Sequence, residues 1–354
     1  MNRVLFGGGF DPIHLGHLNM AEKASKELDA DVIFIPAPIS IWKKESVSIE
    51  HKIVMVELAI KDNPRFSLDL FEVNSGKSEN YSIDTAEYFV QKYPKDKIFY
   101  LIGADHVNSF HKWKDAKRLS EIVQIVFFER PGIVLDESNI AEYRMKKISG
   151  ELVDVASTDI RELRDLKLPW DVIEYIQNNN LYYMKDIASY LGEKRLNHSI
   201  QVAMLAYKIA VANKLENPEK YYAAGILHDI GKETPLQKSI MEKEFPEFMD
   251  LGEWSYHQFV GSYLAETHFG IKDRLILDAI KYHATGNENM SLLGKVIYAS
   301  DKIEPTRGFD SSDLISAMMN DAEKGFVIVL DANKEFLTSN RKNVENRLTL
   351  NCFK

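Results

Sequence analysis

The feature that most constrains the fold of this chain is a change in its hydrophobic pattern near residue 184. Before that point, short apolar runs rich in β-branched and aromatic residues alternate with amphipathic stretches, a pattern typical of a parallel sheet with crossover helices. The runs predicted to be strands lie at residues 3–6, 32–35, 98–102 and 125–129. We therefore predict an α/β Rossmann-like domain over residues 1–184.

From residue 185 onward, strand-like runs become scarce and helical periodicity takes over. Within residues 200–211, one apolar stripe at helical spacing is formed by Ile200, Ala203, Met204, Tyr207 and Val211. This half is predicted to be an all-α helical bundle over residues 185–354. The junction is expected near Met184, after a helix at 170–179 and an Asn-rich turn at 178–180.

The size and composition of the chain agree with two soluble domains. A chain of 354 residues with 45% hydrophobic residues is long enough to bury two cores. The single cysteine, Cys352, excludes a disulfide framework and fits a reducing cytoplasm. The start of the chain does not resemble a signal peptide, and we expect no membrane association. The net charge of −9 argues against a nucleic-acid partner.

A glycine turn followed by two histidines dominates the N-terminal sequence. In VLFGGGFDPIHLGHLNMAEKA, an apolar run enters three glycines, and a helix is predicted to begin near His14. Glycines let the backbone approach a ligand closely, and a helix N-terminus offers unpaired N–H groups to phosphate. His14 and His17 share one face of the first turn, where they would stabilise charge during nucleotidyl transfer. The segment has neither the dinucleotide fingerprint nor the P-loop spacing.

The string GGGFDPIHLGHL resembles the opening of bacterial nicotinate mononucleotide adenylyltransferases, members of the HxGH nucleotidyltransferase superfamily. Gly9 stands where that family usually has Thr or Ser. Later stretches resemble the same family in order: YSIDTAEYF, LIGADHVNSFHKW and VASTDIREL, the last with Ala156 where Ser is commoner. The resemblance runs from Arg3 to about Tyr183. It implies AMP transfer from ATP to nicotinate mononucleotide, giving deamido-NAD and pyrophosphate, with Mg²⁺ bridging the phosphates.

The resemblance also implies roles for individual residues. The expected catalytic residues are His14, His17 and Arg161, the last as a bidentate phosphate ligand. Thr85 is expected to hold nicotinate mononucleotide and Trp113 to stack on its ring, although a lone Trp is more often a core aromatic. The expected substrate-binding residues are Gly7, Gly8, Gly9, Phe10, Lys43, Lys44, Thr85, Gly103, Asp105, Trp113, Ser157 and Thr158.

The second half carries a series of histidines and aspartates with the character of metal ligands. Imidazole and carboxylate donors without thiolates suit iron, manganese, zinc or magnesium, and a spacing of about a hundred residues implies a site assembled across several helices. The predicted ligands are His198, His228, Asp229, His257, His283 and Asp301. The other histidines, His51, His106, His111 and His268, are interpreted as structural or surface residues.

The order H…HD…H…H…D resembles the HD phosphohydrolase superfamily. The stretches RLNHSIQVA, LHDIGK, YHQFVGSYLAE, AIKYHATG and ASDKIEPTRGFD resemble bacterial HD proteins that split diadenosine tetraphosphate symmetrically into two ADP. This resemblance covers about Arg195 to Asp310. It implies one or two metal ions, usually iron. Lys232, one helical turn beyond His228, is a predicted catalytic residue that would meet a phosphate oxygen, and Arg307 is another candidate phosphate contact. The tail after about Asp321 has no predicted role.

Two alternatives remain open at this point. The N-terminal domain is expected to use nicotinate mononucleotide, but the same chemistry would serve another mononucleotide or pantetheine phosphate as acceptor. The HD domain is expected to hydrolyse a dinucleoside polyphosphate, but a nucleotide sensor or a general nucleotide phosphohydrolase would carry similar residues.

Overall fold

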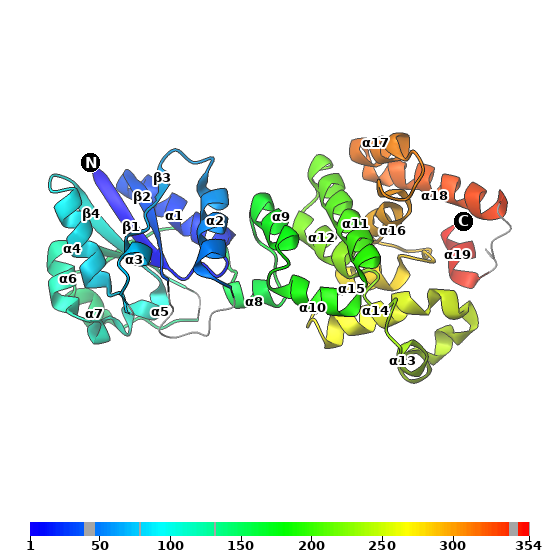
Figure 1. Cartoon of the computed structure of the whole chain (residues 1–354), viewed down its shortest axis with the longest axis horizontal. Helices are drawn as coiled ribbons and strands as arrows, with labels where there is room; N and C mark the ends of the chain where they lie inside the picture. The colour runs from blue at the N-terminus through cyan, green and yellow to red at the C-terminus, as the bar shows by residue number, and fades with distance from the viewer. Residues whose placement is uncertain (39–46, 78, 131, 340–345, 354) are drawn as a thin grey trace. The chain divides into compact units, whose positions relative to one another are not determined.

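The computed structural model describes residues 1–38, 47–77, 79–130, 132–339 and 346–353. The chain forms two compact units, which Figure 1 shows coloured along the sequence. The first unit comprises Met1–Arg161 and Lys167–Asn179, and the second comprises Glu162–Leu166 and Asn180–Lys354. Among the described residues, no helix is both long enough and apolar enough to cross a membrane.

A parallel sheet of six strands in the order β3-β2-β1-β4-β5-β6 organises the first unit (Figure 1). The strands are β1 (Asn2–Gly8), β2 (Ala30–Pro36), β3 (Phe66–Leu68), β4 (Lys97–Ile102), β5 (Gln124–Phe128) and β6 (Lys146–Ile148). The predicted fold class and all four predicted strands are confirmed. The two strands that the sequence did not predict, β3 and β6, are three-residue edge strands, too short for a periodic pattern.

Helices pack around this sheet because each has an apolar face. They are α1 (Leu15–Leu28), α2 (Ile49–Ile60), α3 (Phe71–Asn74), α4 (Ser82–Lys92), α5 (Ala104–Val107), η1 (Phe110–Lys112), α6 (Ala116–Ile122), α7 (Glu137–Glu142), α8 (Ser157–Arg161) and α9 (Trp170–Asn178). The strand order reverses between β1 and β4. Crevices at such a reversal, outside the carboxyl ends of the strands, are where open α/β sheets bind ligands.

The second unit is helical in its described residues, as predicted. Its elements are α10 (Tyr183–Tyr190), α11 (Glu193–Ala212), α12 (Pro218–Leu227), α13 (Gln237–Glu244), η2 (Pro246–Leu251), η3 (Glu253–Ser255), α14 (Tyr256–Thr267), α15 (Arg274–Tyr282), α16 (Leu292–Ile303), α17 (Ser312–Asn320), α18 (Ala322–Ser339) and α19 (Arg347–Cys352). The predicted functional division into 1–184 and 185–354 stays a prediction. Residue 184 itself lies within α10, four residues after the second unit resumes at Asn180.

The predicted apolar stripe on α11 is wrong in its orientation. Val211 is 51% exposed, and of the five stripe residues only Ala203 is buried. The buried face is rotated so that Val202, Ala206 and Ile209 face the core. Small residues decide the orientation, because a Cβ on Gly225 of α12 would lie 2.6 Å from the Cα of Ala203. Helix α12 therefore packs on the alanine-rich side of α11.

Candidate functional sites

The first unit contains a cavity of about 1910 Å³ at the carboxyl ends of β1 and β4. This is where the reversal in strand order predicts a ligand site. Most residues predicted for the adenylyltransferase site line it: Gly7, Gly8, Gly9, Phe10, His14, His17, Gly103, Asp105, Trp113, Ser157, Thr158 and Arg161. Lys43 and Lys44 lie outside the described residues.

His14 and His17 cap the N-terminus of α1. The backbone N–H of His17 donates to Nδ1 of His14, and the N–H of His14 donates to Nδ1 of His17, each at 3.3 Å. The two rings stack with centroids 3.6 Å apart. Because both Nδ1 atoms accept hydrogen bonds, each neutral ring carries its proton on Nε2. Both imidazoles are thus set up as N–H donors in a cavity at a helix N-terminus, which suits an anion.

Close packing explains two of the glycines in this motif. A Cβ at Gly16 would lie 2.9 Å from Val155 and 3.0 Å from the carbonyl oxygen of Val153, so only glycine lets α1 approach that segment. A Cβ at Gly8 would lie 3.1 Å from the Phe10 ring. At Gly9, by contrast, nothing lies within 4 Å of such a Cβ. Packing therefore does not require glycine at position 9, where the family usually has Thr or Ser.

The residues of α8 are tied to the loop that follows β1. Arg161 donates from one guanidinium nitrogen to the carbonyl oxygen of Asp11 at 2.7 Å and from the other to Oγ1 of Thr158 at 3.0 Å. Ser157 Oγ donates to the carbonyl oxygen of Pro12 at 3.1 Å. A guanidinium has five N–H donors, so an arginine held in this way can still donate to phosphate.

Aromatic residues form another part of the cavity wall. Trp113 packs against the core and meets the rings of Tyr100, His106 and Phe110 with centroids 6.3, 5.5 and 5.1 Å away. His106, interpreted from the sequence as a structural or surface residue, also lines the cavity. Nδ1 of His111 lies 3.3 Å from Nδ2 of Asn139.

Thr85 lies behind the cavity wall rather than in it. It is fully buried, and its hydroxyl donates to Oε1 of Glu72 at 2.7 Å. Glu72 does line the cavity, and burial raises the pKa of its carboxyl group. Thr85 therefore contacts Glu72 in this structure, whereas the sequence predicted a direct contact between Thr85 and the ligand. Sequence patterns missed Glu72 and the buried Lys52, which also lines the cavity, because neither stands in a recognisable motif.

The second unit brings the six predicted metal ligands together from five helices. His198 lies on α11, His257 on α14 and Asp301 on α16; His228, Asp229 and His283 lie at the C-terminal ends of α12 and α15. Two groups have potential ligand atoms within 4.8 Å of one another: His198 with His228 and Asp301, and His228 with Asp229 and His283. His257 Nε2 lies 3.2 Å from His283 Nε2 and 3.4 Å from Asp229 Oδ1.

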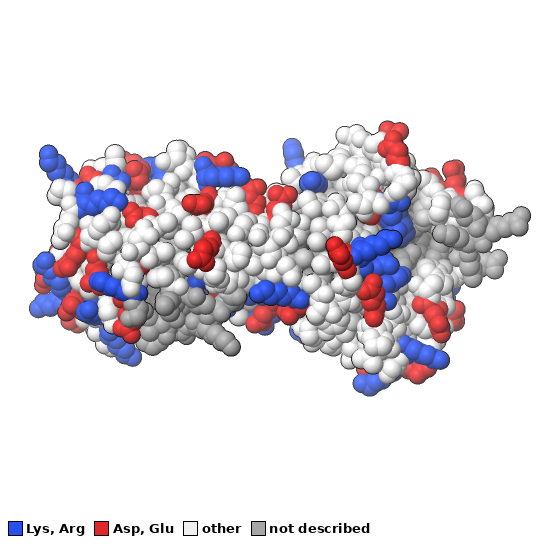
Figure 2. All heavy atoms as spheres, viewed as in Figure 1, with Lys and Arg blue, Asp and Glu red and all other residues white. Residues whose placement is uncertain are grey.

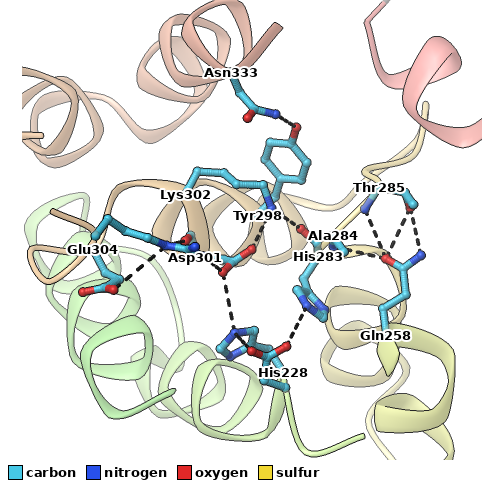
Figure 3. A network of polar contacts seen from close by, with 12 residues as sticks. His228, Gln258, His283, Ala284, Thr285, Tyr298, Asp301, Lys302, Glu304 and Asn333 are labelled. Atoms are coloured by element: carbon cyan, nitrogen blue, oxygen red, sulfur yellow. Dashed lines mark hydrogen bonds and ion pairs between the residues drawn. The ribbon is translucent and has the colours of Figure 1, made fainter. Parts of the chain in front are cut away.

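The partners of the four Nδ1 atoms set the tautomers of these histidines. His228, His283 and His257 have Nδ1 within 2.7 to 3.0 Å of the carbonyl oxygens of residues 225, 280 and 254, and His198 has Nδ1 3.0 Å from Oε1 of Glu304. These oxygens only accept, so Nδ1 donates and each neutral ring directs the lone pair of Nε2 toward the cluster. Figure 3 shows His228, His283 and Asp301 converging.

Burial and neighbouring charges shift the pKa values of several groups in this cluster. Burial lowers the pKa of His228 to about 4 and holds the pKa of His257 well below its usual range. Burial opposes ionisation of Asp229, but His228 and His283 hold its pKa well below the ordinary value. Lys302, His198 and Arg307 do the same for the pKa of Asp301. Burial opposes protonation of His198, but Asp301 and Glu304 raise its pKa. The neutral imidazoles of His228 and His257 beside ionised carboxylates fit a divalent metal.

Cationic side chains surround the cluster in a cavity of about 520 Å³. Its described lining includes two carboxylates, Asp229 and Asp301, and four cationic residues: Arg195, Lys232, Lys302 and Arg307. Arg195 pairs with Asp229 at 2.7 Å, and Lys302 pairs with Asp301 at 2.6 Å. Figure 2 shows Lys and Arg side chains gathered on the visible face of this unit. The excess of positive charge, before any metal is counted, suits a polyphosphate.

Sequence reasoning missed Arg195, Lys302 and Glu304. Glu304 has a side chain only 2% exposed, and it accepts from Thr306 N as well as facing His198. The segment IEPTR gave no reason to separate this carboxylate from a solvated surface charge. Only the fold brings it to His198, 106 residues away in the sequence.

Family models match both units. A cytidylyltransferase-like model matches residues 5–163, and an HD domain model matches residues 195–306. HD domains bind divalent metals, and the paired His/Asp groups described above lie within the matched range.

Individual relatives extend the similarity along the chain. A Mycoplasma genitalium protein described as a "Probable nicotinate-nucleotide adenylyltransferase/Ap4A hydrolase" is 29% identical over 340 residues, covering 92% of this chain and 96% of that protein. An Opitutus terrae "Probable nicotinate-nucleotide adenylyltransferase" is 33% identical, covering 50% of this chain and 95% of that protein. A crystal structure of a Clostridium acetobutylicum "predicted HD superfamily hydrolase involved in NAD metabolism" is 31% identical, covers 51% of this chain and 94% of that one, and has a TM-score of 0.42.

Proposed function

Because this chain belongs to the nicotinate-nucleotide adenylyltransferase family and also carries an HD domain, we propose that it is a bifunctional enzyme of NAD biosynthesis and dinucleotide hydrolysis. The first unit transfers AMP from ATP to nicotinate mononucleotide, giving deamido-NAD and pyrophosphate. The second hydrolyses diadenosine tetraphosphate to two ADP. The proposed location is the cytoplasm. The observation that carries the proposal is that each unit has its own phosphate-suited cavity lined by its family motif.

In the first unit, a phosphate oxygen of nicotinate mononucleotide attacks the α-phosphorus of ATP, and the bond to the β-phosphate oxygen breaks. The Nε2–H groups of His14 and His17, with the first amides of α1, are placed to stabilise the charge that develops. Arg161 is held by Asp11 and Thr158, so its remaining donors are oriented before substrate arrives. Trp113 offers a ring on which nicotinate stacks. Mg²⁺ is proposed to accompany the ATP phosphates.

In the second unit, His198, His228, Asp229, His257, His283 and Asp301 would hold one or two divalent ions, with iron the proposed metal. When bound, such a metal would supply Lewis-acid chemistry by neutralising phosphate oxygens and activating water. Lys232 and Arg307, with Arg195 and Lys302, would bind the phosphate chain and orient one of its central phosphorus atoms for attack. The oxygen of water bonds to that phosphorus atom, the bond to the oxygen bridging the two central phosphorus atoms breaks, and each half leaves as ADP.

The test uses the full chain with each substrate pair. ATP and nicotinate mononucleotide with Mg²⁺ should yield deamido-NAD, and competition with nicotinamide mononucleotide measures which acceptor is preferred. Diadenosine tetraphosphate with Fe²⁺ or Mn²⁺ should yield ADP as its only nucleotide product. Absence of dinucleotide formation rejects the first activity. A chain that binds metal but leaves diadenosine tetraphosphate intact rejects the second and favours a sensor.

A further inference from the structure

The last helices of the chain form a wall of the hydrolase cavity. The HD domain match ends at residue 306, yet α18 and α19 contribute side chains that line this cavity. These residues are Asn333, Phe336, Leu337 and Thr349. The tail that the sequence left without a role is therefore part of the site.

Hydrogen bonds fix this wall to the residues around the metal cluster. Asn333 Nδ2 donates to the hydroxyl of Tyr298 at 2.7 Å, a contact visible in Figure 3. Tyr298 is buried, and Nζ of Lys302 lies 4.6 Å from the centre of its ring. Thr349 Oγ1 donates to the carbonyl oxygen of Thr285 at 2.9 Å. The wall is thus a packed part of the second unit rather than a loose tail.

Two large aromatic side chains in the cavity lining are about half exposed. Trp254 is 47% exposed, and its backbone carbonyl oxygen accepts from Nδ1 of His257 at 3.0 Å, so the residue lies next to a predicted metal ligand. Phe336 is 53% exposed and lies three residues after Asn333, on the same face of α18. Exposed aromatic surface next to convergent polar groups is a recurring feature of ligand sites.

We propose that Trp254 and Phe336 form a nucleobase subsite, and that the segment from α18 to α19 makes the hydrolase selective for nucleoside polyphosphates over inorganic polyphosphate. This rests on the proposed hydrolase function. The cationic residues take the phosphate chain, so the attached nucleoside must lie beside them, where Trp254 and Phe336 present exposed aromatic surface. A cavity of about 520 Å³ has the size of a site for one small ligand, here one nucleoside with its nearest phosphates.

The test compares Trp254→Ala and Phe336→Ala with the unaltered full chain, using the metal-loaded protein. The KM for diadenosine tetraphosphate should rise about 5- to 100-fold, since a lost base stack typically weakens binding by that order. Inhibition of the same reaction by inorganic tripolyphosphate should change less than about twofold, because the cationic residues remain. Trp254→Phe should restore most of the lost affinity. Val327→Ala, on an exposed position of α18 outside the cavity lining, should behave as the unaltered chain.

The subsite is overturned if the variants weaken substrate binding and tripolyphosphate inhibition equally, or if KM does not change. It is also overturned if tripolyphosphate does not inhibit the unaltered chain. If the unaltered chain hydrolyses no dinucleoside polyphosphate, the hydrolase proposal fails separately. Calorimetric titration of the same variants with ADP and inorganic pyrophosphate then decides the subsite. Binding to the first unit is common to all the proteins and cancels in the comparison. A loss of affinity confined to ADP supports the subsite, and an equal response to both ligands rejects it.

Discussion

Histidines line both cavities of this protein, but the two units hold them in opposite tautomers. In the first unit, His14 and His17 lie at a helix N-terminus, where backbone N–H groups donate to Nδ1 and leave the proton on Nε2. In the second unit, His228 and His283 lie at helix C-termini, where carbonyl oxygens accept from Nδ1 and leave a lone pair on Nε2. One set is prepared to donate to phosphate, and the other to bind a cation.

The difference shows how a helix end can select the chemistry of an imidazole. Unpaired N–H groups lie at the beginning of a helix and unpaired carbonyl groups at its end. A histidine at the beginning therefore meets hydrogen-bond donors, and a histidine at the end meets acceptors. Burial reinforces the choice in the second unit, because it lowers the pKa of His228 to about 4 and so keeps the ring neutral near pH 7. The five predictions below test whether the two sites really work by separate chemistry.

The largest expected effect comes from Asp229→Ala. Asp229 Oδ1 lies 3.4 and 3.5 Å from Nε2 of His257 and His283, so its loss removes the anionic ligand predicted between them. Changes around a metal's ligands already cost about 10- to 100-fold, and we expect hydrolysis of diadenosine tetraphosphate to fall at least about a thousandfold. Deamido-NAD formation by the same preparation should stay within twofold of the unaltered rate. Loss of both activities would contradict the independence of the sites.

His17→Ala should produce the converse pattern. It removes one Nε2–H donor and the ring that stacks on His14. Removal of one such donor typically costs about 100- to 1000-fold in kcat, which we expect for deamido-NAD formation. Hydrolysis of diadenosine tetraphosphate, assayed in parallel, provides the control and should not change. A rise in KM alone, with kcat intact, would exclude a role for His17 in stabilising the transition state.

Glu304→Ala should weaken metal binding without removing a ligand. Glu304 accepts from Nδ1 of His198 and thereby orients its Nε2 toward Asp301, 3.1 Å away. We expect an affinity for Mn²⁺ about 10- to 100-fold lower by equilibrium dialysis. Glu304→Gln keeps an acceptor and should retain most of the affinity. Glu323→Ala, at a surface carboxylate paired with Lys295, is the matched control. Unchanged metal affinity in Glu304→Ala would remove this carboxylate from the site.

Trp113→Ala should raise the KM for nicotinate mononucleotide by about tenfold, within the range expected for a lost stack on an aromatic base. The KM for ATP should change much less. Trp113→Phe keeps an aromatic ring, so its KM for nicotinate mononucleotide should lie between those of the unaltered chain and Trp113→Ala. If the KM values for both substrates rise together, Trp113 supports the packing of Tyr100 and Phe110 rather than the nicotinate ring.

The smallest effect concerns the pH dependence of stability through Glu72. Burial raises the pKa of this carboxyl group above its ordinary value of 4.5. As pH rises past 4.5, the unfolded chain releases a proton that the folded chain retains, so stability falls until pH reaches the raised pKa of Glu72 and stays at that lower level above it. Glu72→Gln lacks this penalty and can still accept from Thr85. The Tm of this variant, relative to the unaltered chain, should therefore increase between pH 4 and 7; a constant difference contradicts the buried carboxylate.

Local sequence patterns predicted much of the fold and the motif residues. The four longer strands were predictable because each carries enough β-branched and aromatic residues to show its period, whereas β3 and β6 were too short. The orientation of α11 could not be predicted, because small alanines rather than the larger apolar residues face α12. Thr85 was predicted to meet a ligand, but its burial against Glu72 depends on packing between α3 and α4, which no motif records.

The amino-acid sequence by itself determined the order of fold classes, the glycine turn and the spacing of His14 and His17. These features depend on neighbours within one turn or one strand, so the chain specifies them directly. Only the tertiary structure decided which distant groups meet: Glu304 with His198, and Asn333 with Tyr298. Such contacts depend on how helices pack, and helix packing follows from the shapes of many side chains at once rather than from any local pattern.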